Sequence, residues 1–421
     1  MYIKKAVLFL LVISATLSAC NSQPGSGEQK QDSSNQTSTV MKDTYPSGTF
    51  GYDLQFLTSR DSGLIVLKSA DGASQIIISP KYQAKVFTST AEGFDGKSFG
   101  WVNYKAFDGP LDPHMNGYGG EDRLWLGPEG GKFSLYFKPG VQQAFADWHT
   151  PAPIDSEPWN LVSNDGKKVA MSKDMNLQNY AGTQLQMKVD RDVELIDNAG
   201  INSLLGISLN DKVRSVGFKT VNSITNTGSN EWTEQTGAPC TWNLDMFMPS
   251  EKCVIVIPYI NEGSGKIATT DYFGEIPKDR IKMENGILYF KADGKSRGKL
   301  GIVPPRVKNV AGSYDALGNV LTITKFDVDN NAKYLNQEWR TDRDPYSGDA
   351  MNAYNDGPLE DGSQMGPFYE IESVSPPAFL KPGQKLAHNH SVFHFTGDKA
   401  ALTEIAKKVL GVSLEEIEKA F

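Results

Sequence analysis

Short apolar runs of β type, separated by glycine-containing turns, are the feature that most limits the fold of this chain. Asp71-Gly72 separates the first two runs, and Asn-Gly or Asp-Gly pairs recur along the chain. Such pairs favour tight turns between antiparallel strands. The pattern predicts a mainly β protein, a large antiparallel sandwich or barrel without a repeat of fixed period. The expected strands include residues 64–67, 75–78, 132–137, 254–257, 287–290, 320–324 and 391–395.

The C-terminal residues follow a helical pattern instead. Apolar side chains recur three and four positions apart between Leu402 and Leu410, and Gly411 follows as a stop signal. Ser413 and Glu416 have the spacing of a capping box for a second short helix. We expect a β domain over residues 47–397 and a short helical cap over residues 398–421, packed on the sandwich.

The N-terminus resembles that of a bacterial lipoprotein. Lys4 and Lys5 precede an apolar run, residues 6–17, which is too short to span a bilayer. The run ends in LSAC at residues 17–20, which resembles a lipobox, where the chain is cut before an acylated cysteine. The prediction is a signal peptide over residues 1–19 and a flexible, polar tether over residues 20–46, starting at Cys20 with its acyl chains such as palmitate. It places the protein in the bacterial cell envelope, where it contacts the membrane through this anchor alone.

The net charge argues against one class of partner, and the cysteine content leaves one possible disulfide. The net charge of −8 argues against a nucleic-acid partner, because binding to phosphates needs a basic face. With Cys20 acylated, Cys240 and Cys253 remain, and a disulfide between them is left open. No cofactor is predicted, and the oligomeric state is left open.

A glycine-rich stretch over residues 117–131 gathers the first group of candidate ligand-binding side chains. Arg123 offers a planar donor fork for hydroxyls or a carboxylate, and Trp125 offers a flat face for a sugar ring. Glu121 and Glu129 are the acidic candidates beside them. The alternative is a glycine-bent strand whose arginine pairs with a neighbouring carboxylate.

The second group lies between residues 368 and 394. Glu370 and Glu372 are two positions apart on an expected strand, so they share a face, as do His388 and His390 on the next. Three interpretations are open: an acid–base pair of Glu372 and a histidine, a metal site at His388 and His390, or a solvent-facing amphipathic sheet.

Several short motifs resemble the galactose mutarotase-like superfamily. They are IISP at residues 77–80 with AKV at 84–86, GGEDRLWLGPE at 119–129, and FYEIES at 368–373 with LKPG at 380–383. The resemblance covers roughly residues 48–397 and is strongest to extracytoplasmic lipoproteins of Bacteroidetes-type bacteria in this group. It implies a β-supersandwich with a sugar-sized groove on a concave sheet.

In that superfamily a glutamate removes the proton of the anomeric hydroxyl, and a histidine protonates the ring oxygen. The resemblance implies Glu372 as the base, with Glu370 as the lesser alternative, and Arg123 as a hydroxyl clamp. The superfamily's central histidine motif has no match here. His114, His149 and His388 are therefore candidates for the acid by residue type alone, and His114 is preferred to His149.

These patterns favour a lipid-anchored, carbohydrate-active protein with aldose-epimerase-like chemistry and a carbohydrate ligand. A non-catalytic glycan-binding lipoprotein with the same groove is the alternative. A metal-dependent enzyme at His388 and His390 is the third hypothesis.

Overall fold

The computed structural model describes residues 44–421, and Thr44–Phe421 is one compact unit. The predicted signal peptide, Cys20 and most of the predicted tether lie outside the described residues. Within residues 44–421, no helix is both long and apolar enough to cross a membrane.

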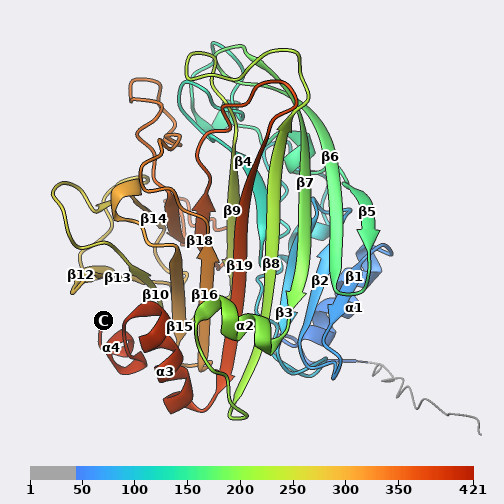
Figure 1. The fold of residues 1–421 in the computed structure, drawn as a ribbon, viewed down its shortest axis with the longest axis vertical. Coiled ribbons are helices and arrows are strands. Elements are labelled where there is room, and N and C mark those ends of the chain that lie inside the picture. Colours follow the sequence, from blue (N-terminus) through green and yellow to red (C-terminus); the bar gives the residue numbers. More distant parts are fainter. Residues whose placement is uncertain (1–43) are drawn as a thin grey trace, which may run out of the picture. The chain divides into compact units, whose positions relative to one another are not determined.

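β-Strands are the main regular elements of residues 44–421, and four α-helices accompany them (Figure 1). The strands are β1 Ile65–Lys68, β2 Gln75–Ser79, β3 Lys85–Thr90, β4 Arg123–Gly127, β5 Asn160–Asn164, β6 Lys168–Gln178, β7 Gln184–Ile196, β8 Val213–Asn226, β9 Cys240–Phe247, β10 Cys253–Pro258, β11 Ala268–Thr269, β12 Ile281–Glu284, β13 Ile287–Lys291, β14 Gly298–Ile302, β15 Val310–Asp315, β16 Val320–Phe326, β17 Met351–Asn355, β18 Tyr369–Val374 and β19 Lys385–Gly397. The α-helices are α1 Phe50–Arg60, α2 Asn198–Leu205, α3 Lys399–Leu410 and α4 Leu414–Glu418. Short 3₁₀ turns lie at Tyr104–Phe107, Phe145–Asp147, Ala152–Ile154 and Pro304–Arg306.

The strands form three antiparallel sheets. The largest has ten strands in the order β12-β13-β10-β15-β16-β19-β8-β7-β6-β5, and the second has six in the order β11-β14-β17-β18-β9-β4. The third is the β1-β2-β3 sheet, which contains the hairpin predicted around Asp71-Gly72. The predicted antiparallel sandwich with a C-terminal helical cap is therefore confirmed.

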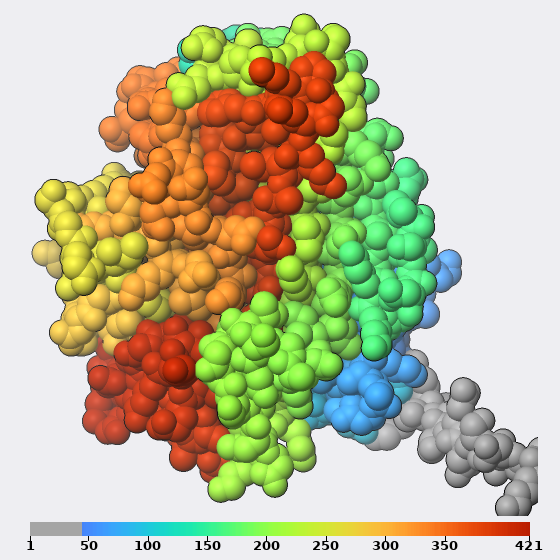
Figure 2. All heavy atoms as spheres, viewed as in Figure 1, coloured from blue at the N-terminus to red at the C-terminus, as the bar shows by residue number. Residues whose placement is uncertain are grey.

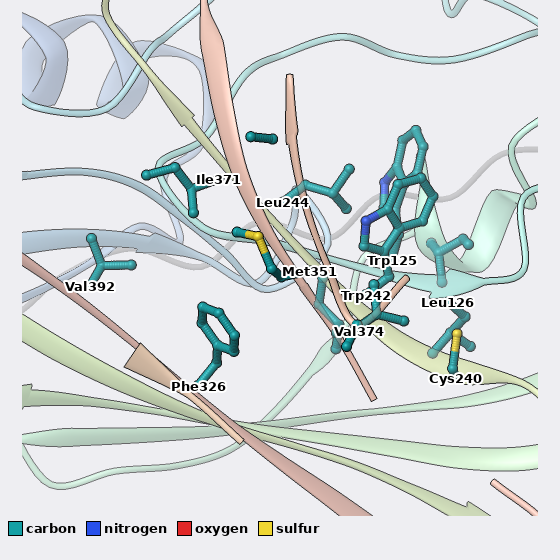
Figure 3. Packing of buried hydrophobic residues seen from close by; sticks show 14 of the residues in the cluster. Trp125, Leu126, Cys240, Trp242, Leu244, Phe326, Met351, Ile371, Val374 and Val392 are labelled. Carbon is teal, nitrogen blue, oxygen red and sulfur yellow. The ribbon is translucent and has the colours of Figure 1, made fainter. Parts of the chain in front are cut away.

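The main apolar core joins side chains of the six-stranded and ten-stranded sheets. Ile371 and Met351 come from the six-stranded sheet, and Val392 and Phe326 come from the ten-stranded sheet (Figure 3). Cys240 belongs to this core, and both Cys240 and Cys253 are free, buried thiols. The disulfide that the sequence left open is not formed, and burial raises the pKa of Cys240 to about 12.

A second core covers the other face of the ten-stranded sheet. Phe393 and Phe395 of β19 pack there against apolar side chains of α2, α3 and α4. Figures 1 and 2 show α2 and the C-terminal helices side by side over the lower part of this face. Gly411 ends α3 in the left-handed region, at φ 77°, and Ser413 with Glu416 forms the predicted capping box. Alternate side chains of β19 thus serve two cores.

One predicted strand is wrong. Residues 132–137 have the alternation of a strand but form bends, although Phe133, Tyr136 and Phe137 are buried. The Ser134 hydroxyl donates to the Glu129 carbonyl and accepts from the Tyr136 amide, and the Leu135 amide bonds to Pro128. These local bonds satisfy backbone groups that a strand would present to a neighbour.

Candidate functional site

A cavity of about 640 Å³ lies against one face of the six-stranded sheet. Alternation along each strand separates the two faces of this sheet. On β9, Trp242, Leu244 and Met246 line the cavity, whereas the Asp245 carboxylate accepts a hydrogen bond from His390 of the ten-stranded sheet. The cavity is therefore on the side away from the sandwich interior.

Aromatic rings form much of the cavity wall. Trp125 and Trp242 are neighbours across β4 and β9, with ring centroids 5.7 Å apart and planes at 79° (Figure 3). Loop residues complete the wall. The aromatic residues that line the cavity are Trp125, Phe145, Trp148, Trp242, Phe273, Trp339, Tyr354 and Phe368. Such flat apolar faces suit the C–H faces of a pyranose ring.

Two buried ion pairs form the charged floor of the cavity. Arg123 Nη2 lies 2.7 Å from Glu370 Oε1, and Lys299 Nζ lies 3.0 Å from Glu372 Oε2. Glu372 Oε2 also accepts from the Trp242 indole N–H at 2.7 Å. All four charged residues are buried, and Arg123, Lys299 and Glu370 line the cavity. Glu372 lies just beneath them, and its Oε1 atom has no hydrogen-bond partner in the described structure.

Burial and the neighbouring charges perturb these groups. Burial raises the pKa of Glu370 to about 7, against the attraction of the Arg123 guanidinium and helped by the Glu372 charge. Burial also raises the pKa of Glu129, which lines the same cavity. For Lys299, burial favours the neutral amine, but the carboxylates of Glu372, Glu129 and Glu370 outweigh it and raise the pKa. The site thus holds a cationic lysine beside a carboxyl group that titrates near neutrality.

The structure brings together five predicted residues in this cavity: Arg123, Trp125, Glu129, Glu370 and His114. His114 Nδ1 donates to the Trp148 carbonyl at 2.6 Å, and the ring stacks between Phe145 and His149, at 4.7 Å from each. His149 is outside the cavity lining, and its Nδ1 donates to the Pro113 carbonyl.

Glu121 does not reach the cavity, contrary to the sequence prediction. Its Oε1 accepts from Ser89 at 2.7 Å and from His394 at 2.9 Å, and the residue is fully buried. Glu121 lies just before β4, and its backbone amide donates to the carbonyl of Phe87 in β3. It therefore does not follow the alternation that places Arg123 and Trp125 on the cavity face.

His388 and His390 also lie away from the cavity, so neither the predicted Glu372–His388 pair nor a His388–His390 metal site is formed. A contact between Glu372 and His388 would need β18 and β19 to pair, but the two strands belong to different sheets. The rings instead meet Ser373 on the opposite face of β18 from Glu372, with Ser373 Oγ 2.9 Å from each. Residues 44–421 contain no group of three or more metal-ligating side chains placed to hold an ion.

Lys299 and Trp242 were not predicted from the sequence. Lys299 stands in a short, glycine-flanked strand, GKLGI, without a motif to mark it. Trp242 had a usable signal, because Trp242, Leu244 and Met246 alternate with polar residues along β9. Lys299 Nζ lies 4.7 Å from the Trp242 ring centroid, so the two residues are in contact at the cavity floor.

The fold and site define a class: an antiparallel β-sandwich protein with an aromatic-walled, ion-paired cavity on its smaller packed sheet. The chain belongs to a family of unknown function, DUF6786, whose model matches residues 48–421. No curated protein matches the sequence.

Solved structures with similar chain traces come from several bacteria. A galactose mutarotase-like protein from Lactobacillus casei is 11% identical, with 79% of this chain and 100% of that chain covered and a TM-score of 0.49. An aldose 1-epimerase candidate from Escherichia coli is 11% identical, with coverage of 79% and 99% and a TM-score of 0.47. A galactose mutarotase related enzyme from Lactobacillus acidophilus is 9% identical, with coverage of 79% and 97% and a TM-score of 0.41.

Proposed function

We propose that this protein binds a sugar in the cavity and catalyses acid–base chemistry at its anomeric centre, in the manner of an aldose epimerase. The observation that carries the proposal is Glu370, a carboxyl group at the floor of an aromatic-walled cavity with a pKa of about 7. A group that titrates near the working pH can both accept and return a proton.

Geometry favours Glu370 over Glu372 as the group that meets the ligand. Glu370 lines the cavity, whereas Glu372 lies beneath it and accepts from Lys299 and Trp242. In this proposal Glu370 takes the proton of the anomeric hydroxyl while the ring C–O bond breaks and the ring oxygen is protonated. Closure on the other face of the carbonyl then gives the second anomer. His114 is the candidate acid: its Nδ1–H donates to the Trp148 carbonyl, so in this proposal the imidazolium form carries a second proton on Nε2 and gives that proton to the ring oxygen.

The proposal includes the envelope location that the N-terminal sequence indicates. Residues 17–20, LSAC, provide the acylation site at Cys20, and the polar segment that follows would tether the β domain to the membrane surface. In this proposal the acyl anchor only holds the protein at the membrane, and the cavity acts on soluble or cell-surface sugars outside the cytoplasm.

Two linked measurements test this function. Calorimetric titration against a panel of aldoses, uronic acids and short oligosaccharides identifies the ligand, and NMR exchange spectroscopy then measures its anomer interconversion. We expect Glu370→Gln to abolish the interconversion with a change in Kd of less than about threefold, because the neutral amide keeps the shape. Binding without interconversion in the unmodified protein would identify a glycan-binding protein instead. The absence of any saccharide binding would refute the proposal.

A further inference from the structure

Arg297 is a cation at the cavity that the ion pairs of the floor do not use. It directly precedes β14, it lines the cavity, and its side chain is exposed. Arg123 and Lys299, deeper in the cavity, each have a carboxylate partner. Arg297 forms no ion pair with any carboxylate within residues 44–421. The guanidinium is therefore available to an anion from outside the protein.

The Arg297 guanidinium is also held in place. Its Cζ atom lies 3.8 Å from the centroid of the Phe273 ring, and its Nε donates to the Tyr354 hydroxyl at 3.3 Å. Phe273 covers one face of the group and Tyr354 occupies the Nε edge, so the Nη donors remain for a ligand. A guanidinium fixed in this way presents a planar donor fork to a carboxylate or a sulfate at little cost in side-chain entropy.

The acidic residues of the cavity are already engaged within the protein. Glu370 pairs with Arg123, and Asp112 accepts from the His114 amide at 2.7 Å. Glu129 accepts from the Trp339 side chain and is attracted mainly by Lys299, with a smaller attraction by Arg297 that is not an ion pair. Lys105, a second exposed cation of the lining, also forms no ion pair among the described residues. Two cations without an ion-pair partner among the described residues therefore line one cavity, although the net charge of the chain is −8.

We propose that the ligand is an acidic saccharide, a sugar that carries a carboxylate or a sulfate, and that Arg297 binds this charged group. This inference rests on the proposed function, because it names the substrate class of the same cavity. The sugar ring would stack on the aromatic wall and reach Glu370, while the oxyanion lies against Arg297 and Phe273. Lys105 would add a longer-range attraction.

Matched pairs of sugars test this proposal. Titration calorimetry on the full chain in detergent would compare galacturonate with galactose, glucuronate with glucose, and galactose 6-sulfate with galactose. We expect the acidic member to bind at least about tenfold more tightly, the range of a charge-assisted hydrogen bond. Arg297→Gln should remove the difference in affinity between the acidic and the neutral member of each pair. Arg214→Gln, an exposed arginine on β8 outside the cavity lining, is the matched control and should change neither.

Each outcome decides a different point. The acid that gains more, uronate or sulfate ester, identifies the source of the charge. Equal affinity for acidic and neutral sugars in the unmodified protein would overturn the acidic ligand and leave the proposed function standing. An acidic preference that survives Arg297→Gln would overturn the role of Arg297. Failure of every saccharide to bind would overturn both proposals, and a melting curve on each variant would establish that the protein under test is folded.

Discussion

The buried ion pair of Lys299 and Glu372 should contribute strongly to stability. Removal of one partner leaves an uncompensated buried charge, which costs about 3–5 kcal/mol, whereas removal of both leaves none. We expect Lys299→Met and Glu372→Gln each to lower the free energy of unfolding in this range. The double variant should lose clearly less than the sum.

Denaturant unfolding of the two single variants and the double variant measures this coupling. The matched control is Lys333→Met, which breaks an exposed pair with Glu234 and should change stability by less than about 1 kcal/mol. Strictly additive losses at Lys299 and Glu372 would show that the two charges do not support one another.

Glu370 gives a prediction with a defined sign in pH. Its folded-state pKa of about 7 lies above the ordinary glutamate value of 4.5, so the native protein binds this proton more tightly than the unfolded chain. The stability from this group is fully present below about pH 4.5 and is lost as the pH rises through 7. We expect the stability of Glu370→Gln relative to the unmodified protein to increase between these values.

Urea titrations of both proteins at several pH values give this difference directly and cancel the other titrating groups. Asp245, with a pKa raised to about 7 by burial, would otherwise contribute in the same direction. Glu251→Gln is a control of opposite sign, because its exposed ion pair with Lys295 lowers the pKa of Glu251. A flat difference for Glu370→Gln would contradict the raised pKa.

At the scale of elements, local patterns predicted those strands and helices whose side-chain periodicity is read within one segment. The hairpin at Asp71-Gly72 and the helices beyond Asp398 are of this kind. The arrangement of strands into sheets is not local. The acid–base interpretation of Glu372 and His388 required the consecutive strands β18 and β19 to pair, but the chain between them crosses to the other sheet. That crossing separates Glu372 from His388 and accounts for the error at the site.

Because strand pairing is not local, only some of the site residues could be predicted from the sequence. Arg123, Trp125 and Glu370 lie in motifs rich in functional side chains, so composition alone drew attention to them. Lys299 acquires its role only from the pairing of β14 with β17, which brings it beside β18 and Glu372. A lone lysine between glycines carries no such information in the sequence.

The helical cap gives a prediction for a whole element. Leu402 of α3 is fully buried in the second core, on the outer face of the ten-stranded sheet. We expect Leu402→Ala to lower the free energy of unfolding by about 2–5 kcal/mol, because it removes buried methyl groups and leaves a cavity. Lys408→Ala, at an exposed position of the same helix, should change it by less than about 0.5 kcal/mol. Similar small losses for both variants in urea unfolding would mean that the cap packs loosely.

In the whole molecule, the two packed sheets have different surroundings. The ten-stranded sheet has apolar cores on both faces, and the six-stranded sheet has the sandwich on one face and the cavity on the other. Between them, Arg191 of β7 pairs with Asp122 at 3.2 Å, and Asn222 of β8 bonds to Asn243 of β9 at 3.1 Å. Buried polar contacts of this kind need one relative placement of the sheets to be satisfied. These contacts therefore fix the position of β4 and β9, which carry Arg123 and Trp242.

The placement of the molecule in the cell gives the last prediction. If Cys20 is acylated, Cys20→Ser removes the anchor, and the β domain has no other predicted membrane contact. We expect the full chain to appear in the membrane fraction of expressing bacteria and Cys20→Ser to move to the soluble fraction, as immunoblots of the separated fractions would show. Ser26→Ala, in the tether, should stay with the membrane. Because the cavity lies wholly within residues 44–421, the soluble variant should keep the ligand affinity of the anchored protein. A variant that remains in the membrane fraction would contradict the lipid anchor and leave the chemistry of the cavity untouched.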